Sequence, residues 1–200
     1  MQNIVIFGGT FNPVHIGHIE MLSELNSLSY VDKIIIMPSK IPPHKDVDFL
    51  ADESHRASMC EIAARMFSKV TVSTLELMRE GKSYTIDTIR ELLNIYKGAK
   101  IYITIGGDML LSFKTWNRYE EIIKHASIIC FNRGNCDISK VVDSIAFLRK
   151  KGADITLIDK KITDVSSTYL RENIDNHEIL KKFIPREILD FINKNSVYGG

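Results

Sequence analysis

Two glycines and two histidines near the start of the chain have the spacing of a phosphate-binding site. Residues 8–18 read G-G-T-F-N-P-V-H-I-G-H and follow a β-branched run. Glycines let the backbone approach a ligand closely, and the N–H groups that open a helix attract anions. His15 and His18 would share one face of the first helical turn, where both rings could donate hydrogen bonds to phosphoryl oxygens.

Other interpretations of the same residues are weaker. A single histidine is more often a half-buried structural residue, but a pair on one face after a glycine turn favours a site. A metal pair lacks a nearby acidic or cysteine ligand, so we expect no protein-held metal. The segment lacks the Lys-Ser or Lys-Thr of a P-loop and the G-x-G-x-x-G spacing of a dinucleotide fingerprint.

Short apolar runs alternate with helical patterns along the chain, and these elements must position the histidines. The predicted strands are residues 4–7, 33–37, 70–74, 101–105, 128–131 and 155–158. The predicted helices cover residues 16–28, stripes at 86–96 and 141–148, and a last helix opened by Pro185. The alternation predicts an α/β fold with a doubly wound, mostly parallel sheet, and ligands at the carboxyl ends of the strands.

Length and composition limit the class of protein. The chain has 200 residues, 44% of them hydrophobic, which predicts a single domain over residues 1–200. With 26 basic and 25 acidic residues the formal charge is +1, so no nucleic-acid partner is expected. The start of the chain reads as a strand, and no run of apolar residues is long enough for a membrane span. The odd number of cysteines, 3, without a CxxC pair predicts a cytoplasmic location.

A second group of polar residues lies late in the chain, where residues 165–171 read V-S-S-T-Y-L-R. The serines and threonine can cap a short helix, and Ser167, Thr168 and Arg171 can hold triphosphate oxygens. Taken alone, the segment would be an ordinary helix cap.

The two segments together resemble the signatures of the HxGH nucleotidyltransferase superfamily, and they bracket almost the whole chain. Val165 and Leu170 are conservative departures from the I-S-S-T-x-I-R form of the second signature. The middle of the chain resembles the bacterial nicotinate-mononucleotide adenylyltransferase family. That resemblance rests on P-P-H-K at 42–45, S-Y-T-I-D-T at 83–88, and I-G-G-D at 105–108 followed by Trp116.

The resemblance implies a Rossmann-like nucleotidyltransferase fold and adenylyl transfer from ATP to nicotinate mononucleotide, giving deamido-NAD and pyrophosphate. It implies that His15 and His18 are catalytic and that Mg²⁺ enters with the ATP phosphates. The residues expected to bind ATP and phosphate are Gly8, Gly9, Thr10, Phe11, Lys45, Gly106, Ser167, Thr168 and Arg171. The residues expected to bind nicotinate mononucleotide are Thr85, Asp108 and Trp116.

Several alternatives remain open at this point. Trp116 could be a packing residue, Asp108 could only start a helix, and Lys45 could be a solvated charge. The acceptor could be another small phosphate, such as phosphopantetheine or a substrate for cytidylyl transfer. The chain could instead be a catalytically silent nucleotide sensor. Assembly into a homo-oligomer is also compatible with the sequence.

Overall fold

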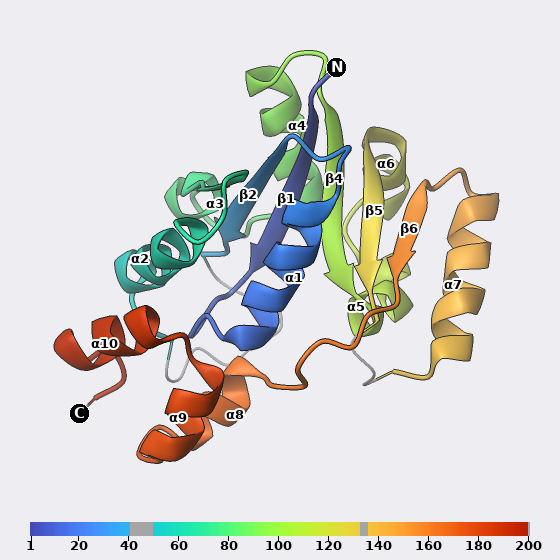
Figure 1. The fold of residues 1–200 in the computed structure, drawn as a ribbon. Helices are drawn as coiled ribbons and strands as arrows, with labels where there is room; N and C mark the ends of the chain where they lie inside the picture. The colour runs from blue at the N-terminus through green and yellow to red at the C-terminus, as the bar shows by residue number, and fades with distance from the viewer. Residues whose placement is uncertain (41–49, 133–135, 200) are drawn as a thin grey trace.

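Parallel strands form a single sheet at the centre of the molecule (Figure 1). The computed structural model describes residues 1–40, 50–132 and 136–199. Within these ranges the strands are β1 (Asn3–Gly9), β2 (Lys33–Pro38), β3 (Val70–Val72), β4 (Lys100–Gly106), β5 (Ala126–Phe131) and β6 (Ile155–Ile158). Their order is β3-β2-β1-β4-β5-β6, and every neighbouring pair is parallel. The predicted fold class is confirmed.

The strands are apolar on both faces because helices cover both faces. Neighbouring residues of β1 illustrate this arrangement, since Val5 belongs to one hydrophobic core and Ile4 to the other. Both side chains are fully buried, and so are Ile34 in β2 and Ile128 in β5. The β-branched runs in the sequence therefore predicted the strands correctly.

Two layers of helices enclose the sheet. One core is formed with α1 (Ile16–Ser27), α2 (Glu53–Ala64), α8 (Ser167–Glu172), α9 (His177–Phe183) and α10 (Arg186–Lys194). The other core is formed with α4 (Thr85–Ile95), α5 (Gly107–Leu111), α6 (Tyr119–His125) and α7 (Ile138–Lys150). Figure 1 shows α1 in front of the sheet and α4 and α6 behind it. Two short helices, α3 (Leu75–Met78) and the 3₁₀ helix η1 (Phe113–Thr115), lie in connections.

The direction of winding changes between β1 and β4, which lie side by side with Asn3 opposite Lys100 and Ile6 opposite Ile103. From β1 the chain proceeds to β2 and β3 on one side, and from β4 to β5 and β6 on the other. The segments that leave the carboxyl ends of β1 and β4 therefore diverge and leave space for a ligand. Residues 8–13 and 106–108 are those segments.

Most helix boundaries agree with the sequence patterns. The first helix was expected at residues 16–28 and covers Ile16–Ser27, while the last begins directly after Pro185. Helices α2, α3, α6 and α9 were not predicted. None of the helices in the described ranges combines the length and the apolar character needed to cross a bilayer.

Candidate active site

The turn after β1 is shaped by close packing between Gly9 and Phe11. A Cβ atom on Gly9 would lie 3.0 Å from Phe11 Cζ, so only glycine fits without moving the ring. Phe11 has a left-handed backbone (φ 52°) and is 2% exposed. Its ring centroid lies 5.1 Å from that of His18. The ring of Phe11 therefore packs inside the turn, and its predicted contact with ATP stays a prediction.

The structure brings His15 and His18 together at the start of α1. Their rings are stacked, with centroids 3.7 Å apart and planes inclined by 27°. The backbone N–H of His15 donates to His18 Nδ1 at 3.2 Å. Since Nδ1 accepts this bond, a neutral His18 carries its proton on Nε2, where it can donate to a ligand. His15 is 3% exposed, and His18 is half-buried.

The glycine between the histidines permits close contact with the segment before α8. A Cβ atom on Gly17 would lie 3.1 Å from the carbonyl oxygen of Thr163 and 3.2 Å from His15 Nδ1. Glu20 fixes the same contact, because its carboxylate accepts from Thr163 N at 2.6 Å and from Thr163 Oγ1 at 2.7 Å. Helix α1 therefore holds the chain that leads into the second signature segment.

The second signature segment is hydrogen-bonded to the first. Ser166 caps α8, its hydroxyl accepting from Tyr169 N at 3.1 Å. Ser167 Oγ donates to the carbonyl oxygen of Pro13 at 2.9 Å, and Arg171 Nη1 donates to that of Asn12 at 2.8 Å. Residues separated by about 150 positions in the sequence are thus in direct contact beside β1.

Arg56 in α2 is a residue of this region that sequence reasoning missed. Its side chain is fully buried and binds only backbone carbonyl oxygens among the contacts of the described residues. Nη1 donates to Thr10 at 2.9 Å and to Ser39 at 2.6 Å. Nε donates to Ala51 at 3.1 Å, and Nη2 to Lys40 at 3.3 Å.

Arg56 therefore ties the turn after β1 to the segment after β2 and places a positive charge beneath Thr10. Burial lowers the pKa of this guanidinium by penalising its charged form. In the sequence, the available signal is that Arg56 shares a helical face with Met59, Cys60 and Ala63, where a charge is unusual.

The predicted acceptor side begins at α4, whose first residue is Thr85. A polar network holds this helix start. Thr88 Oγ1 donates to Glu76 Oε1 at 2.7 Å and accepts from Arg79 Nη1 at 3.0 Å. Arg79 Nη2 also pairs with Glu91 at 2.9 Å. Burial raises the pKa of Glu76.

Trp116 lies at the same end of the molecule as Thr85. Glu121 in α6 pairs with Arg90 in α4 at 2.6 Å. Arg90 lies five positions after Thr85, and Glu121 lies five positions after Trp116. Trp116 is half-buried, with its ring centroid 5.1 Å from that of Phe113, so it combines packing with an accessible face.

The remaining predicted residues fall into two groups. Gly106 precedes α5 as its N-cap, and Asp108 is exposed in the first turn of that helix. Lys45 and residues 42–44 lie outside the described residues. In the described part of the chain, no cluster of three histidine, cysteine or carboxylate side chains could hold a metal ion.

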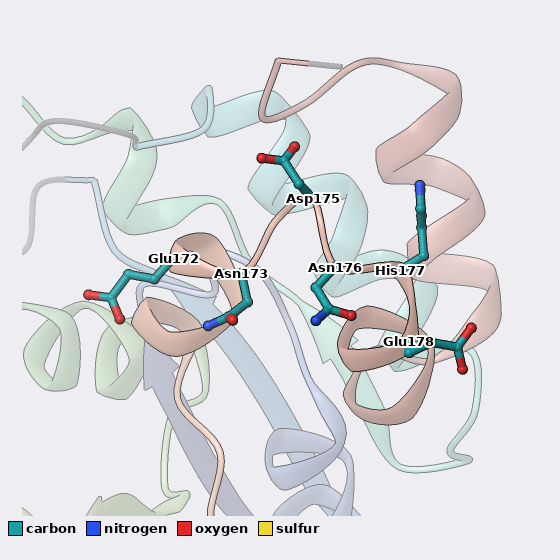
Figure 2. A pocket seen from close by; sticks show the side chains of 6 residues that line it. All are labelled: Glu172, Asn173, Asp175, Asn176, His177 and Glu178. Atoms are coloured by element: carbon teal, nitrogen blue, oxygen red, sulfur yellow. The ribbon is translucent and has the colours of Figure 1, made fainter.

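A surface pocket lies elsewhere, at the turn between α8 and α9. Figure 2 shows its side chains spreading apart, with the carboxylates of Glu172, Asp175 and Glu178 pointing in different directions. Its lining residues are Glu172, Asn173, Asp175, Asn176, His177 and Glu178. Three carboxylates repel phosphate, and no predicted site residue lines this pocket. The switch point between β1 and β4 remains the candidate site.

Comparisons with known proteins agree with this geometry. Residues 6–173 match the family described as Cytidylyltransferase-like. A probable nicotinate-nucleotide adenylyltransferase of Oceanobacillus iheyensis is 32% identical over 199 residues, covering 100% of this chain and 98% of that protein. A protein of the same description from Carboxydothermus hydrogenoformans is 33% identical, covering 98% of this chain and 97% of that protein.

Solved structures show the same fold. The nicotinic acid mononucleotide adenylyltransferase of Plasmodium falciparum complexed with NaAD has a TM-score of 0.80 and 22% identity, covering 99% of this chain and 98% of that one. The same enzyme complexed with APC has a TM-score of 0.79 at the same identity, 22%.

Proposed function

The chain belongs to the cytidylyltransferase-like family and, within it, to the nicotinate-nucleotide adenylyltransferases, and we propose that it transfers AMP from ATP to nicotinate mononucleotide. The products are deamido-NAD and pyrophosphate. We also propose that residues 1–200 act as one domain in the cytoplasm, where ATP is available.

One observation supports this assignment most directly: the contact between the two signature segments. Arg171 and Ser167 donate to the carbonyl oxygens of Asn12 and Pro13, which lie between the glycine turn and the histidines. The N-termini of α1 and α8, the imidazoles and the guanidinium are thereby gathered beside one turn. Such a concentration of donors fits a triphosphate.

The reaction requires positioning more than acid–base chemistry. An oxygen of the acceptor's 5′-phosphate, already ionised near neutral pH, forms a bond to the α-phosphorus of ATP. The bond from that phosphorus to the bridging oxygen of the β-phosphate breaks, and pyrophosphate leaves in line. His18 Nε2 and His15 would donate to phosphate oxygens whose charge grows during this step. Thr10, Thr168 and Arg171 would hold the leaving phosphates, and Ser167 would do so through its backbone N–H, since its hydroxyl donates to Pro13.

Magnesium fits this site as a companion of ATP. The described residues offer no cage of three metal-ligating side chains near the turn. Mg²⁺ commonly binds through substrate phosphates and water with few protein ligands. When bound, it would neutralise charge on the triphosphate, while the residues of the turn orient it.

The acceptor would lie across the switch point, between the starts of α4 and α5 and Trp116. The first N–H groups of α4, at Thr85, face a region that the helix dipole makes favourable for a carboxylate. Trp116 offers a ring on which a pyridine can stack, and Asp108 is exposed to accept hydrogen bonds from ribose hydroxyls.

The proposal is tested by incubating the protein with MgATP and nicotinate mononucleotide. Pyrophosphate release and deamido-NAD formation should be equal in amount. Phosphopantetheine as acceptor and CTP as donor test the alternatives within the family. Nucleotide binding without pyrophosphate release under any pairing would identify a silent sensor and refute the proposal.

A further inference from the structure

The side chain of Asn12 links the phosphate-binding turn to a distant part of the chain. Asn12 is 3% exposed. Its Oδ1 accepts from the hydroxyl of Tyr198 at 2.8 Å and from the backbone N–H of Ala51 at 3.1 Å. Tyr198 lies 186 positions further along the sequence. Burial of this hydroxyl raises the pKa of the Tyr198 phenol.

The fold places Tyr198 here through α10. Ile188, Leu189 and Ile192 of this helix share a hydrophobic core with Met59 and Ala63 of α2. After α10 the chain turns back, as Val197 N donates to the carbonyl oxygen of Ile192 at 3.1 Å. Ser196 has a left-handed backbone (φ 46°) at this reversal. The packing of α10 on α2 thus places the Tyr198 phenol beside Asn12 in the turn after β1.

Asn12 is held on two sides. Its main-chain carbonyl oxygen accepts from Arg171, and its side-chain oxygen accepts from Tyr198 and Ala51. Two residues earlier, the main-chain carbonyl oxygen of Thr10 accepts from Arg56. The short stretch between the glycines and His15 is therefore anchored from several elements, and Tyr198 supplies one of these anchors.

We propose that Tyr198 is a positioning residue for adenylyl transfer, acting through Asn12 to hold the turn that carries Thr10 and His15. This rests on the proposed function. Without the phenol hydroxyl, Asn12 Oδ1 would lose one of its donors and keep the N–H of Ala51. The turn would then sample positions in which its donors no longer meet the reacting phosphates. Small displacements of this kind reduce the rate of a transfer step that depends on alignment.

Tyr198→Phe removes only the hydroxyl, and Tyr30→Phe is its matched control. Tyr30 lies at the amino ends of the strands, away from the site, where its carbonyl oxygen accepts from Asn3 Nδ2 at 2.8 Å. We expect kcat to fall about three- to tenfold in Tyr198→Phe, the range of one hydrogen bond. The KM for nicotinate mononucleotide should stay within about twofold, since α4 and Trp116 are untouched. Tyr30→Phe should leave kcat unchanged.

A merely structural role predicts a different pattern. It would lower Tm in Tyr198→Phe while leaving kcat of the folded protein at the wild-type value, and that result would overturn the proposal. The dependence on Asn12 is tested in the Asn12→Ala background, where Tyr198→Phe should cause no further loss. A further loss equal to that in the wild type would equally overturn it.

A readout that does not depend on the reaction separates this proposal from the function itself. Amide hydrogen exchange of residues 10–15 should be faster in Tyr198→Phe than in the wild type or Tyr30→Phe. If the wild type releases no pyrophosphate, the proposed function fails, and exchange still tests the anchor. If the wild type is active and exchange and kcat are unchanged in Tyr198→Phe, only the anchor is refuted.

Discussion

His15 and His18 differ in how much of each ring a ligand can reach. His15 is 3% exposed and forms one side of the ring stack, whereas His18 is half-buried and accepts from the His15 N–H through Nδ1. A Cβ atom at Gly17 would touch the ring of His15, which shows how tightly that ring is packed. We therefore expect His18 to be the principal donor to the transition state, and His15 to combine donation with support.

Replacing His18 by alanine should lower kcat by about 10²–10³, the usual effect of losing one transition-state donor. Tm should change little, because the ring is only half-buried. Pyrophosphate release and thermal melting are measured on the same preparation. His177→Ala, at an exposed position in α9, should leave both unchanged. Near-normal turnover of His18→Ala would remove this residue from the mechanism.

Replacing Arg56 by lysine should weaken both stability and turnover. Lysine keeps the charge but cannot reach four carbonyl oxygens with a planar fork of donors. Hydrogen bonds to charged groups are worth about 1.5–3 kcal/mol each, so the free energy of unfolding should fall by about 2–4 kcal/mol. Urea denaturation at constant slope measures this loss. Arg65→Lys, at the exposed C-cap of the same helix, is the control, and an equally small effect of both changes would contradict the anchoring role of Arg56.

Sequence reasoning succeeded for residues whose chemistry is local and failed for those whose partners are remote. The glycines, histidines and Ser166–Thr168 stand in short segments that predict a turn or a cap directly. Arg56 acts through four carbonyl oxygens in three separate segments, and Tyr198 through a side chain 186 positions away. The partners of Arg56 and Tyr198 produce no periodic or local pattern in the sequence.

At the scale of single elements, we expect the start of α4 to determine which acceptor is preferred. Thr85 is the first helical residue, as predicted, and the network of Glu76, Arg79 and Thr88 fixes the chain around it. The N–H groups of a helix start can donate to a carboxylate, which the helix dipole also favours. A carboxamide presents an NH₂ group that competes with those donors.

Nicotinate mononucleotide should therefore be preferred over nicotinamide mononucleotide by at least about tenfold in kcat/KM. One hydrogen bond to a charged group is worth about 1.5–3 kcal/mol, and about 1.4 kcal/mol corresponds to a factor of ten. Kinetics with both acceptors under identical conditions measure the ratio. Equal efficiency would refute the role of Thr85 while leaving adenylyl transfer itself intact.

Elements with strong intrinsic patterns were predicted and the others were not. Apolar runs of β-branched residues gave all six described strands, although the third ends at Val72 because Thr74 already caps α3. Helix α2 was missed because charged and small residues interrupt its apolar stripe. Its buried face becomes evident only in the structure, where it packs on the sheet and α10. The winding order follows from the alternation of elements, but the docking of α8 on the first turn does not.

At the scale of the whole molecule, the product should stabilise the protein more than either substrate alone. Deamido-NAD would span the switch point and contact the segments after both β1 and β4, whereas each substrate contacts mainly one side. A ligand at one hundred times its Kd adds about 2.7 kcal/mol. This should raise Tm by roughly 5–11 °C for a chain of this size. Melting curves with each ligand test the expectation, and a product effect no larger than that of ATP would contradict it.

The hydrogen bonds that reach Asn12 also have a consequence for the order of synthesis. A ribosome adds roughly 5–20 residues per second, so Tyr198 is made roughly ten to forty seconds after Asn12. The nascent sheet can form its β1–β2 pair early, but Arg171 and Tyr198 are still missing from the turn. The growing polypeptide therefore carries both histidines well before it has a completed site, and full activity should appear only when α10 and Tyr198 have been translated.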